Sequence, residues 1–393
     1  MWDRISKGAR MILPLVVLVT NMPVHHQVDL FDAISLTERV RLRVFYLRKM
    51  SAGRSWSVPI DMKHAHVFLP EIRLKNHWYI NRQIMLLLRE IERADLVVIG
   101  QYAAVTMQIA MYYCAIRKIP WVFWSETISG VDYDERPLVR NDGLRRFLRR
   151  LAIQPIMRWP RRCWGVGRKA LASFSATLPH SRFDIYPYHS YLAPFLNLSP
   201  PTGRTCRFLY SGRAIYQKGF DIVVDAVRLL VRSGCPDFTV RVVGNGPLFD
   251  LITDDVRDRF ELVGFVQHED VHRHFAGCDV LLFPSRYDGW GLALIEGLAS
   301  ALPVIASPRA GAAQDAIDDG INGWMLLRLD PEALAEKMEF CLRSIDRVHA
   351  MSSSARRSSL AYDVVAGAGR FIDLVESAIP EVRVPKLSAG GGI

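Results

Sequence analysis

Residues 279–307 have the sequence DVLLFPSRYDGWGLALIEGLASALPVIAS, which combines a strand, a turn, a helix and the start of another strand. The apolar run Val280–Phe283 predicts a strand buried on both faces, and Pro284 ends it. After a turn with two glycines, apolar residues recur at helical spacing until Pro303 opens the next strand. Such a unit predicts a parallel sheet with helices packed on it.

The turn of this unit brings two carboxylates close in sequence. Asp288 lies just before the helix and Glu296 lies inside it, eight residues later, so both could face one ligand. The turn residues Gly289, Gly291 and Leu292 would present backbone N–H groups at the positive end of the helix dipole, which suits a phosphate. The alternative is that Asp288 caps the helix and Glu296 lies on its surface.

The pattern Asp288-Gly-Trp-Gly-Leu-Ala-Leu-Ile-Glu296 resembles the signature of retaining glycosyltransferases of the GT-B fold, of the group 1 type (family 4) found in bacterial surface-polysaccharide synthesis. The first acid of that signature is usually glutamate, so Asp288 is one methylene shorter. The resemblance implies an α/β chain with two Rossmann-like domains, each with a doubly wound parallel sheet, that face a cleft.

Composition agrees with a large globular chain. Its 393 residues are enough for two domains, half of them are hydrophobic and 23% are charged. Residues 1–200 hold 29 lysines and arginines against 15 acids, whereas residues 201–393 hold 21 against 25. The N-terminal half is therefore expected to face something anionic.

The cysteines and the N-terminus favour a cytoplasmic protein. Six cysteines are scattered without a CxxC pair or a Cys/His metal spacing, which predicts reduced thiols and no metal site. The apolar run 11–19 follows two basic residues but is short, contains Pro14 and lacks a cleavage site, so a first strand is expected rather than a signal peptide. No run approaches the roughly 20 apolar residues of a membrane span.

The predicted domain organisation has five parts. A Pro- and Gly-bearing stretch without periodicity marks a linker between two domains. By resemblance, the last helical region crosses back to the first domain. The expected parts are an acceptor-binding Rossmann-like domain over 1–195, a linker over 196–205, a nucleotide-sugar-binding Rossmann-like domain over 206–347, a crossing helix over 348–380 and a flexible tail over 381–393.

In the first domain, strands are predicted at 15–19, 42–47, 95–100 and 120–126, and helices from about Asp29, at 78–91 and at 105–117. Ligands of such a sheet bind at the carboxyl ends of its strands. Glu126 ends the last of these strands. The resemblance implies that Glu126 contacts the donor sugar, because many relatives carry a cleft histidine there. The alternative is a capping or solvated glutamate.

His25 and His26 follow the first strand, in a loop that the resemblance places in the cleft, near the acceptor. Many relatives have glycines there, so the acceptor contact does not carry over. Adjacent side chains do not easily point at one ion, which disfavours a metal site.

The second domain opens with a strand that runs into Gly212-Arg213, followed by Lys218-Gly219. This order resembles the family's second signature, in which the arginine and lysine hold the donor's diphosphate. Arg213 offers a planar fork and Lys218 a compact charge, so together they would neutralise the leaving diphosphate without a metal ion. Alternatively, both are solvated loop cations.

Further motifs follow in family order. The turn Gly244-Asn245-Gly246 resembles the one beside the nucleotide, and Phe265 ends the strand next to the base. A lone Gly-x-Gly is also found in ordinary turns. The chain lacks the G-x-G-x-x-G fingerprint of dinucleotide-binding oxidoreductases, so the ordered set favours a glycosyltransferase.

A basic segment lies between these two regions. From Arg136 to Lys169 there are eleven lysines and arginines and one acid, and several arginines alternate with leucines and Phe147. This pattern is typical of an amphipathic helix that docks on an anionic membrane surface. A solvated basic face is the alternative. No motif supports nucleic-acid binding.

The resemblance implies transfer of a hexose from a UDP- or GDP-linked sugar to a glycan acceptor, with retention of configuration at the anomeric carbon. By analogy the acceptor would be lipid-linked, and no cofactor or metal would be required. The enzyme would be cytoplasmic and peripheral on the inner face of the membrane. Arg213, Lys218 and the turn N–H groups would stabilise the departing diphosphate. Asp288 and Glu126 would contact the sugar, and Glu296 the ribose. Alternatives are a nucleotide-sugar epimerase, a phosphorylase, or a non-catalytic GT-B protein that binds glycan or membrane.

Overall fold

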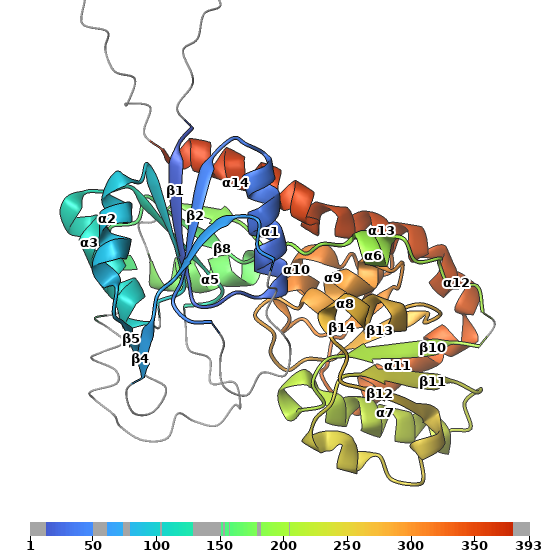
Figure 1. Ribbon diagram of the computed structural model, residues 1–393. Helices are drawn as coiled ribbons and strands as arrows, with labels where there is room; N and C mark the ends of the chain where they lie inside the picture. The colour runs from blue at the N-terminus through green and yellow to red at the C-terminus, as the bar shows by residue number, and fades with distance from the viewer. Residues whose placement is uncertain are drawn as a thin grey trace, which may run out of the picture.

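The computed structural model describes residues 13–49, 61–73, 79–102, 104–128, 151, 154–156, 158–178, 182–203 and 205–379. Two parallel sheets form the centres of two domains that lie side by side, one blue to green and the other yellow to orange in Figure 1. The chain is therefore an α/β protein with two Rossmann-like domains.

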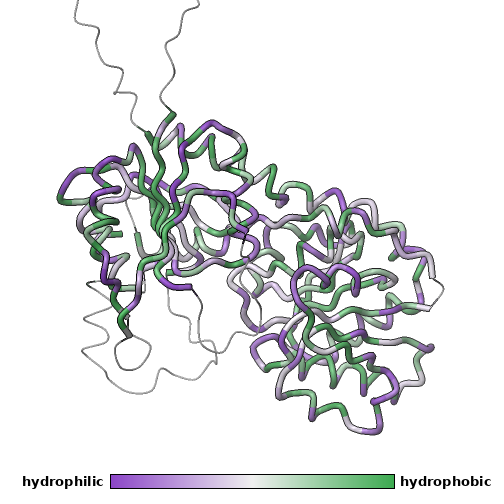
Figure 2. The backbone as a smooth tube through the Cα atoms, in the orientation of Figure 1, coloured by the Kyte–Doolittle hydropathy of each residue, from purple (hydrophilic) through white to green (hydrophobic). Residues whose placement is uncertain are grey.

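The N-terminal sheet has seven parallel strands. Leu18 of the first strand lies in register between Val44 and Val98 of its neighbours, and all three are fully buried. Helices cover the sheet, which is why its central strands are hydrophobic throughout (Figure 2). The strand order is β3 (Ala65–Phe68), β2 (Arg41–Tyr46), β1 (Leu15–Thr20), β6 (Leu96–Gly100), β7 (Trp121–Ser125), β8 (Arg162–Gly165) and β9 (Phe183–Ile185). Helices of this domain are α1 (His25–Leu36), α2 (Ile84–Arg93), α3 (Val105–Arg117) and α5 (Arg168–Thr177). The short helix α6 (Ala193–Leu196) follows and packs on the second domain, where the ring of Phe195 lies 5.2 Å from that of Phe275.

The C-terminal sheet has six parallel strands. Its order is β12 (Phe260–Gly264), β11 (Thr239–Val243), β10 (Arg207–Ser211), β13 (Val280–Phe283), β14 (Val304–Ala306) and β15 (Gly323–Met325). Its helices are α7 (Phe220–Arg232), α8 (His268–Val271), α9 (Leu292–Ala299), α10 (Gly311–Ala316) and α11 (Pro331–Arg343). The strand that opens the signature, β13, lies in the middle of this sheet, between β10 and β14.

Three helices return from the second domain to the first, drawn in red in Figure 1: α12 (Ile345–Ala350), α13 (Ser352–Ser359) and α14 (Val364–Ala378). The last one packs along α1. Its Phe371 ring lies 5.7 Å from the ring of Trp164 on β8, and the hydroxyl of Tyr186 donates to the carbonyl of Gly367. The C-terminal helix is thus part of the core of the N-terminal domain.

Two helices begin several residues away from their predicted starts. The first helix begins at His25 rather than near Asp29, so both histidines lie in its first turn. The helix predicted over 78–91 begins only at Ile84, because the chain first forms β5 (Tyr79–Asn81), which pairs antiparallel with β4 (Glu71–Arg73). Most of the predicted basic helix lies outside the described residues.

No helix among the described residues has the length and apolar character that crossing a bilayer requires.

Candidate active site

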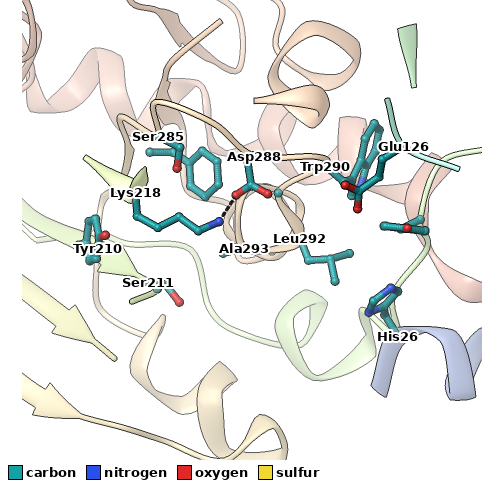
Figure 3. Close-up of a pocket in the computed structure, with 14 residues that line it drawn as sticks. His26, Glu126, Tyr210, Ser211, Lys218, Ser285, Asp288, Trp290, Leu292 and Ala293 are labelled. Atoms are coloured by element: carbon teal, nitrogen blue, oxygen red, sulfur yellow. Dashed lines mark hydrogen bonds and ion pairs between the residues drawn. The ribbon is translucent and has the colours of Figure 1, made fainter. Parts of the chain in front are cut away.

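A cavity of about 290 Å³ lies where the carboxyl ends of both sheets meet (Figure 3). It takes residues from both domains, and six of the predicted site residues line it: Glu126, Gly212, Lys218, Asp288, Gly291 and Leu292. The other lining residues are His26, Tyr188, Tyr210, Ser211, Phe283, Ser285, Trp290 and Ala293.

An ion pair crosses this cavity. The Nζ of Lys218 lies 2.5 Å from Oδ2 of Asp288, and both side chains are mostly buried (Figure 3). Lys218 ends a short 3₁₀ turn, after which Gly219 adopts φ +70°, where a β-carbon would meet the carbonyl oxygen of Pro284 at 2.1 Å. The close approach of these two loops therefore requires glycine. It brings the arginine–lysine signature and the acidic signature to one site.

Arg286 fixes the same two loops from behind. Its guanidinium makes a bidentate pair with Asp221 at 2.6 and 2.7 Å, and it stacks 3.6 Å from the ring centroid of Tyr216. Its backbone N–H donates to the carbonyl of Gln217 at 2.9 Å. The position of Lys218 is thus held by a residue three positions after β13 ends.

Glu126 faces this ion pair from the N-terminal domain. It follows β7 directly, and a β-carbon on Gly289 would lie 1.8 Å from its Oε2, so its carboxylate rests against the backbone of the signature turn. Burial and then the neighbouring Asp288 raise the pKa of Glu126, while a hydrogen bond with Tyr188 and the charges of Lys218 and Lys169 act in the opposite direction. The cavity therefore holds two carboxylates close together with cations beside them.

Lys169 is the second cation near this pair and comes from α5 of the N-terminal domain. Its Nζ donates to the carbonyl of Asp288 at 3.2 Å and to that of Arg309, and it lies 4.2 Å from the ring centroid of Tyr287. Burial lowers the pKa of Lys169, and the carboxylates of Asp288 and Glu126 oppose that shift. Lys169 thus connects one domain to the loop of the other domain that carries Asp288.

A second cavity of about 310 Å³ adjoins the first. Glu296 lines it and is only 7% exposed, and burial raises the pKa of Glu296 to about 7. Phe265 lines it as well, and His25 of α1 stacks on His268 of α8 with ring centroids 4.6 Å apart. His26 and Leu292 line both cavities.

The remaining predicted residues lie around the cavities rather than in their lining. Arg213 is exposed beside Gly212, and no described residue pairs with its guanidinium. Gly244 and Gly246 allow close backbone contacts, because β-carbons there would meet the carbonyl oxygens of Gly212 and Ala214 at 2.0 and 2.3 Å. Asn245 is exposed and accepts a hydrogen bond from the N–H of Ala214 through its carbonyl. Gly289 makes room for Glu126.

The sequence analysis missed several residues of the site. Tyr210, Ser211 and Ser285 are direct neighbours of predicted motifs, so proximity in sequence was the available signal. Tyr188 and Lys169 had no such signal, since they reach the site from distant parts of the chain. Lys169 itself had been counted only as the end of the basic segment.

The arrangement suits a ligand with a negatively charged centre and two uncharged ends. Lys218 and the first N–H groups of α9 can bind anionic oxygens, and the carboxylates can accept hydrogen bonds from hydroxyl groups. Among the described residues, no three His, Cys, Asp or Glu side chains cluster as metal ligands would.

Several known proteins with similar sequences or folds are glycosyltransferases. The family "Glycosyl transferases group 1" matches residues 205–344. The chain is 33% identical over 134 residues to an uncharacterised glycosyltransferase of Methanocaldococcus jannaschii, covering 33% of this chain and 36% of that protein. It is 31% identical over 150 residues to the amylovoran biosynthesis glycosyltransferase AmsK of Erwinia amylovora, covering 36% and 37%. The chain thus matches little more than a third of the length of these relatives.

The fold agrees over nearly the whole chain. The crystal structure of Anabaena HepE in complex with UDP superposes with a TM-score of 0.70 at 15% identity, over 93% of this chain and 100% of that chain. HepE is also known in complex with UDP-glucose. Residues 205–344 therefore match the group 1 glycosyltransferase family, and the two domains together have the GT-B fold.

Proposed function

We propose that this chain is a retaining glycosyltransferase that moves a hexose from a nucleotide diphosphate sugar to a glycan acceptor in polysaccharide synthesis. The observation that carries the proposal is the pair of adjoining cavities. One holds Asp288, Glu126 and Lys218, and the other holds Glu296 and Phe265. A sugar fits the first, a nucleoside the second, and the diphosphate the junction. The UDP bound by HepE supports a UDP-linked donor.

The proposed chemistry follows from where charge develops. As the sugar leaves, negative charge grows on the diphosphate, where Lys218, the N-terminus of α9 and, at the rim, Arg213 would stabilise it. These groups supply the positive charge, so the proposed reaction needs no metal ion or other cofactor. Asp288 and Glu126 would hold hydroxyl groups of the sugar, and Glu296 those of the ribose.

The acceptor is proposed to be a lipid-linked glycan at the cytoplasmic face of a membrane. Support comes from the 29 lysines and arginines against 15 acids in residues 1–200. It also comes from large apolar side chains that the N-terminal domain exposes, among them Ile116 on α3 at 76% and Trp159 at 43%. Such a surface suits an anionic bilayer better than nucleic acid.

The first test is a thermal-shift screen of the protein without added metal against UDP, GDP, ADP and dTDP and their sugar conjugates. A ligand at about 100 times its Kd adds about 2.7 kcal/mol to the folded state, a readable shift. NMR of the product then gives the anomeric configuration. A sugar altered without an acceptor would indicate an epimerase, turnover with free phosphate a phosphorylase, and binding without turnover a non-catalytic protein.

We expect Arg213→Ala and Lys218→Ala each to lower kcat by a factor that corresponds to roughly 2–4 kcal/mol, because each removes one stabiliser of the transition state. Steady-state kinetics with the donor identified by the screen measures this. Arg232→Ala, at the far end of α7, is the matched control and should leave kcat unchanged. Normal turnover of either cleft variant would remove the role assigned to that residue.

A further inference from the structure

His26 occupies the junction of the two cavities. It lines both of them, and Leu292 at the start of α9 is the one other described residue shared by their linings. The two residues come from opposite domains, since His26 lies in the first turn of α1 (Figure 3). Any ligand that fills both cavities at once must pass between this imidazole and the N-terminus of α9.

The His26 side chain is held in place by its neighbours. The His26 ring packs 4.9 Å from the ring of Tyr188, and Tyr188 in turn hydrogen-bonds with Glu126. Its neighbour His25 stacks on His268 and lines the second cavity but not the first. The two adjacent histidines therefore have separate surroundings, one at the junction and one beside the nucleoside pocket.

Electrostatics at the junction favour an anion. Helices α1 and α9 both begin at this junction. Each contributes the partial positive charge of its N-terminus and the N–H groups of its first turn. Lys218 adds a full charge from the first cavity. Glu296, buried and without a hydrogen bond to its carboxylate from any described residue, lies in the second cavity and marks the end where uncharged hydroxyl donors belong.

We propose that His26 is a donor-binding residue that contacts the diphosphate of the nucleotide sugar from the acceptor-binding domain. This inference rests on the proposed function and names the part of the substrate that His26 recognises. An imidazole N–H donates to a phosphate oxygen opposite Leu292, so the diphosphate is held by both domains at once.

The test compares binding of UDP with binding of UMP, because the second phosphate is what lies at the junction. Isothermal titration gives the ratio of the two Kd values for wild type, His26→Phe, His26→Gln and the matched control His25→Phe. We expect His26→Phe to reduce the preference for UDP roughly tenfold or more, the size of one hydrogen bond to a charged group. His26→Gln, which keeps an N–H donor, should retain more of the preference, and His25→Phe should leave it unchanged.

The outcomes separate the two proposals. If wild type binds neither UDP nor GDP, tested in the same way with GMP, the proposed function fails and this inference falls with it. If wild type prefers the diphosphate and His26→Phe preserves that preference, only the role of His26 is overturned. An equal loss of affinity for UDP and UMP in His26→Phe would also overturn it, because the contact would then be with the nucleoside. Thermal melting of each variant without ligand checks that it is folded.

Discussion

At the scale of single residues, we expect Glu296 to make ligand binding depend on pH. Burial raises the pKa of Glu296 from 4.5 to about 7 in the free protein. Ribose hydroxyl groups would donate hydrogen bonds to the carboxylate and so favour its charged form. We therefore expect affinity for UDP-glucose to increase as pH rises through about 7, with binding roughly tenfold weaker at pH 6 than at pH 8. Titration calorimetry at pH 6, 7 and 8 measures this, since the diphosphate of a nucleotide sugar does not titrate there.

Glu296→Gln is the control for this dependence. Its affinity should no longer increase with pH over that range, and a wild type whose affinity does not increase from pH 6 to pH 8 would contradict the assignment. In the absence of ligand, by contrast, the stability of the folded protein should decrease as pH rises. The unfolded carboxyl loses its proton above its ordinary pKa of 4.5, while the folded one keeps it to about 7. Wild type therefore loses stability between these values, and Glu296→Gln should be more stable than wild type at pH 8, by roughly 3 kcal/mol at most, but not below pH 4.5.

At the scale of elements, the signature turn and β7 fit together only without a side chain at Gly289. A β-carbon there would lie 1.8 Å from the carboxylate of Glu126. We expect Gly289→Ala to displace Glu126, lower activity and cost about 1–3 kcal/mol in the free energy of unfolding, as overpacking does. Urea denaturation measures the cost.

A double-mutant cycle isolates that contact. In a Glu126→Ala background the cost of Gly289→Ala should largely disappear, and an undiminished cost would show that another contact causes it. Gly369→Ala is the matched control. A β-carbon at this exposed position of α14 meets nothing within 4 Å, so alanine should be neutral or stabilising there.

The sequence predicted elements well where a single segment determined them. The strand Val280–Phe283 and the helix Val105–Arg117 have the predicted bounds, because each is a continuous pattern closed by its own end signals. The start of α1 was predicted wrongly because histidine is a poor helix former. In the structure, the contact of His25 with His268 of the other domain stabilises that first turn.

The same contrast between local and distant signals separates the site residues that were predicted from those that were missed. Lys218, Asp288 and Gly291 belong to motifs of one domain and were predicted together. His26 and Lys169 meet those motifs only across the cleft, and the hydrogen bond from Lys169 to the carbonyl of Asp288 joins residues 119 positions apart. No local sequence pattern indicates a contact between residues so far apart in the chain. The prediction of the N-terminal domain's part of the site was therefore incomplete.

At the scale of the whole molecule, the start of α5 connects the N-terminal domain to the loop that carries Asp288. Lys169 donates to the carbonyls of Asp288 and Arg309, and the N–H of Arg168 donates to Asp315 at 2.9 Å. Nearby, the hydroxyl groups of Thr127 and Tyr287 lie 3.2 Å apart. These contacts join the domains beside the site rather than at the linker.

Replacing Lys169 by methionine keeps the apolar stem but removes the ammonium group and its hydrogen bonds. We expect faster hydrogen exchange in the loop around Asp288 and in α10, together with a lower kcat, because the loop that carries Asp288 is no longer held across the cleft. The core of each domain is untouched, so exchange in the central strands should not change. Lys118→Met, at an exposed position at the end of α3, removes a lysine without such contacts and should exchange like wild type. Unchanged exchange around Asp288 in Lys169→Met would mean that Lys169 does not hold this loop and that the other contacts between the domains are sufficient.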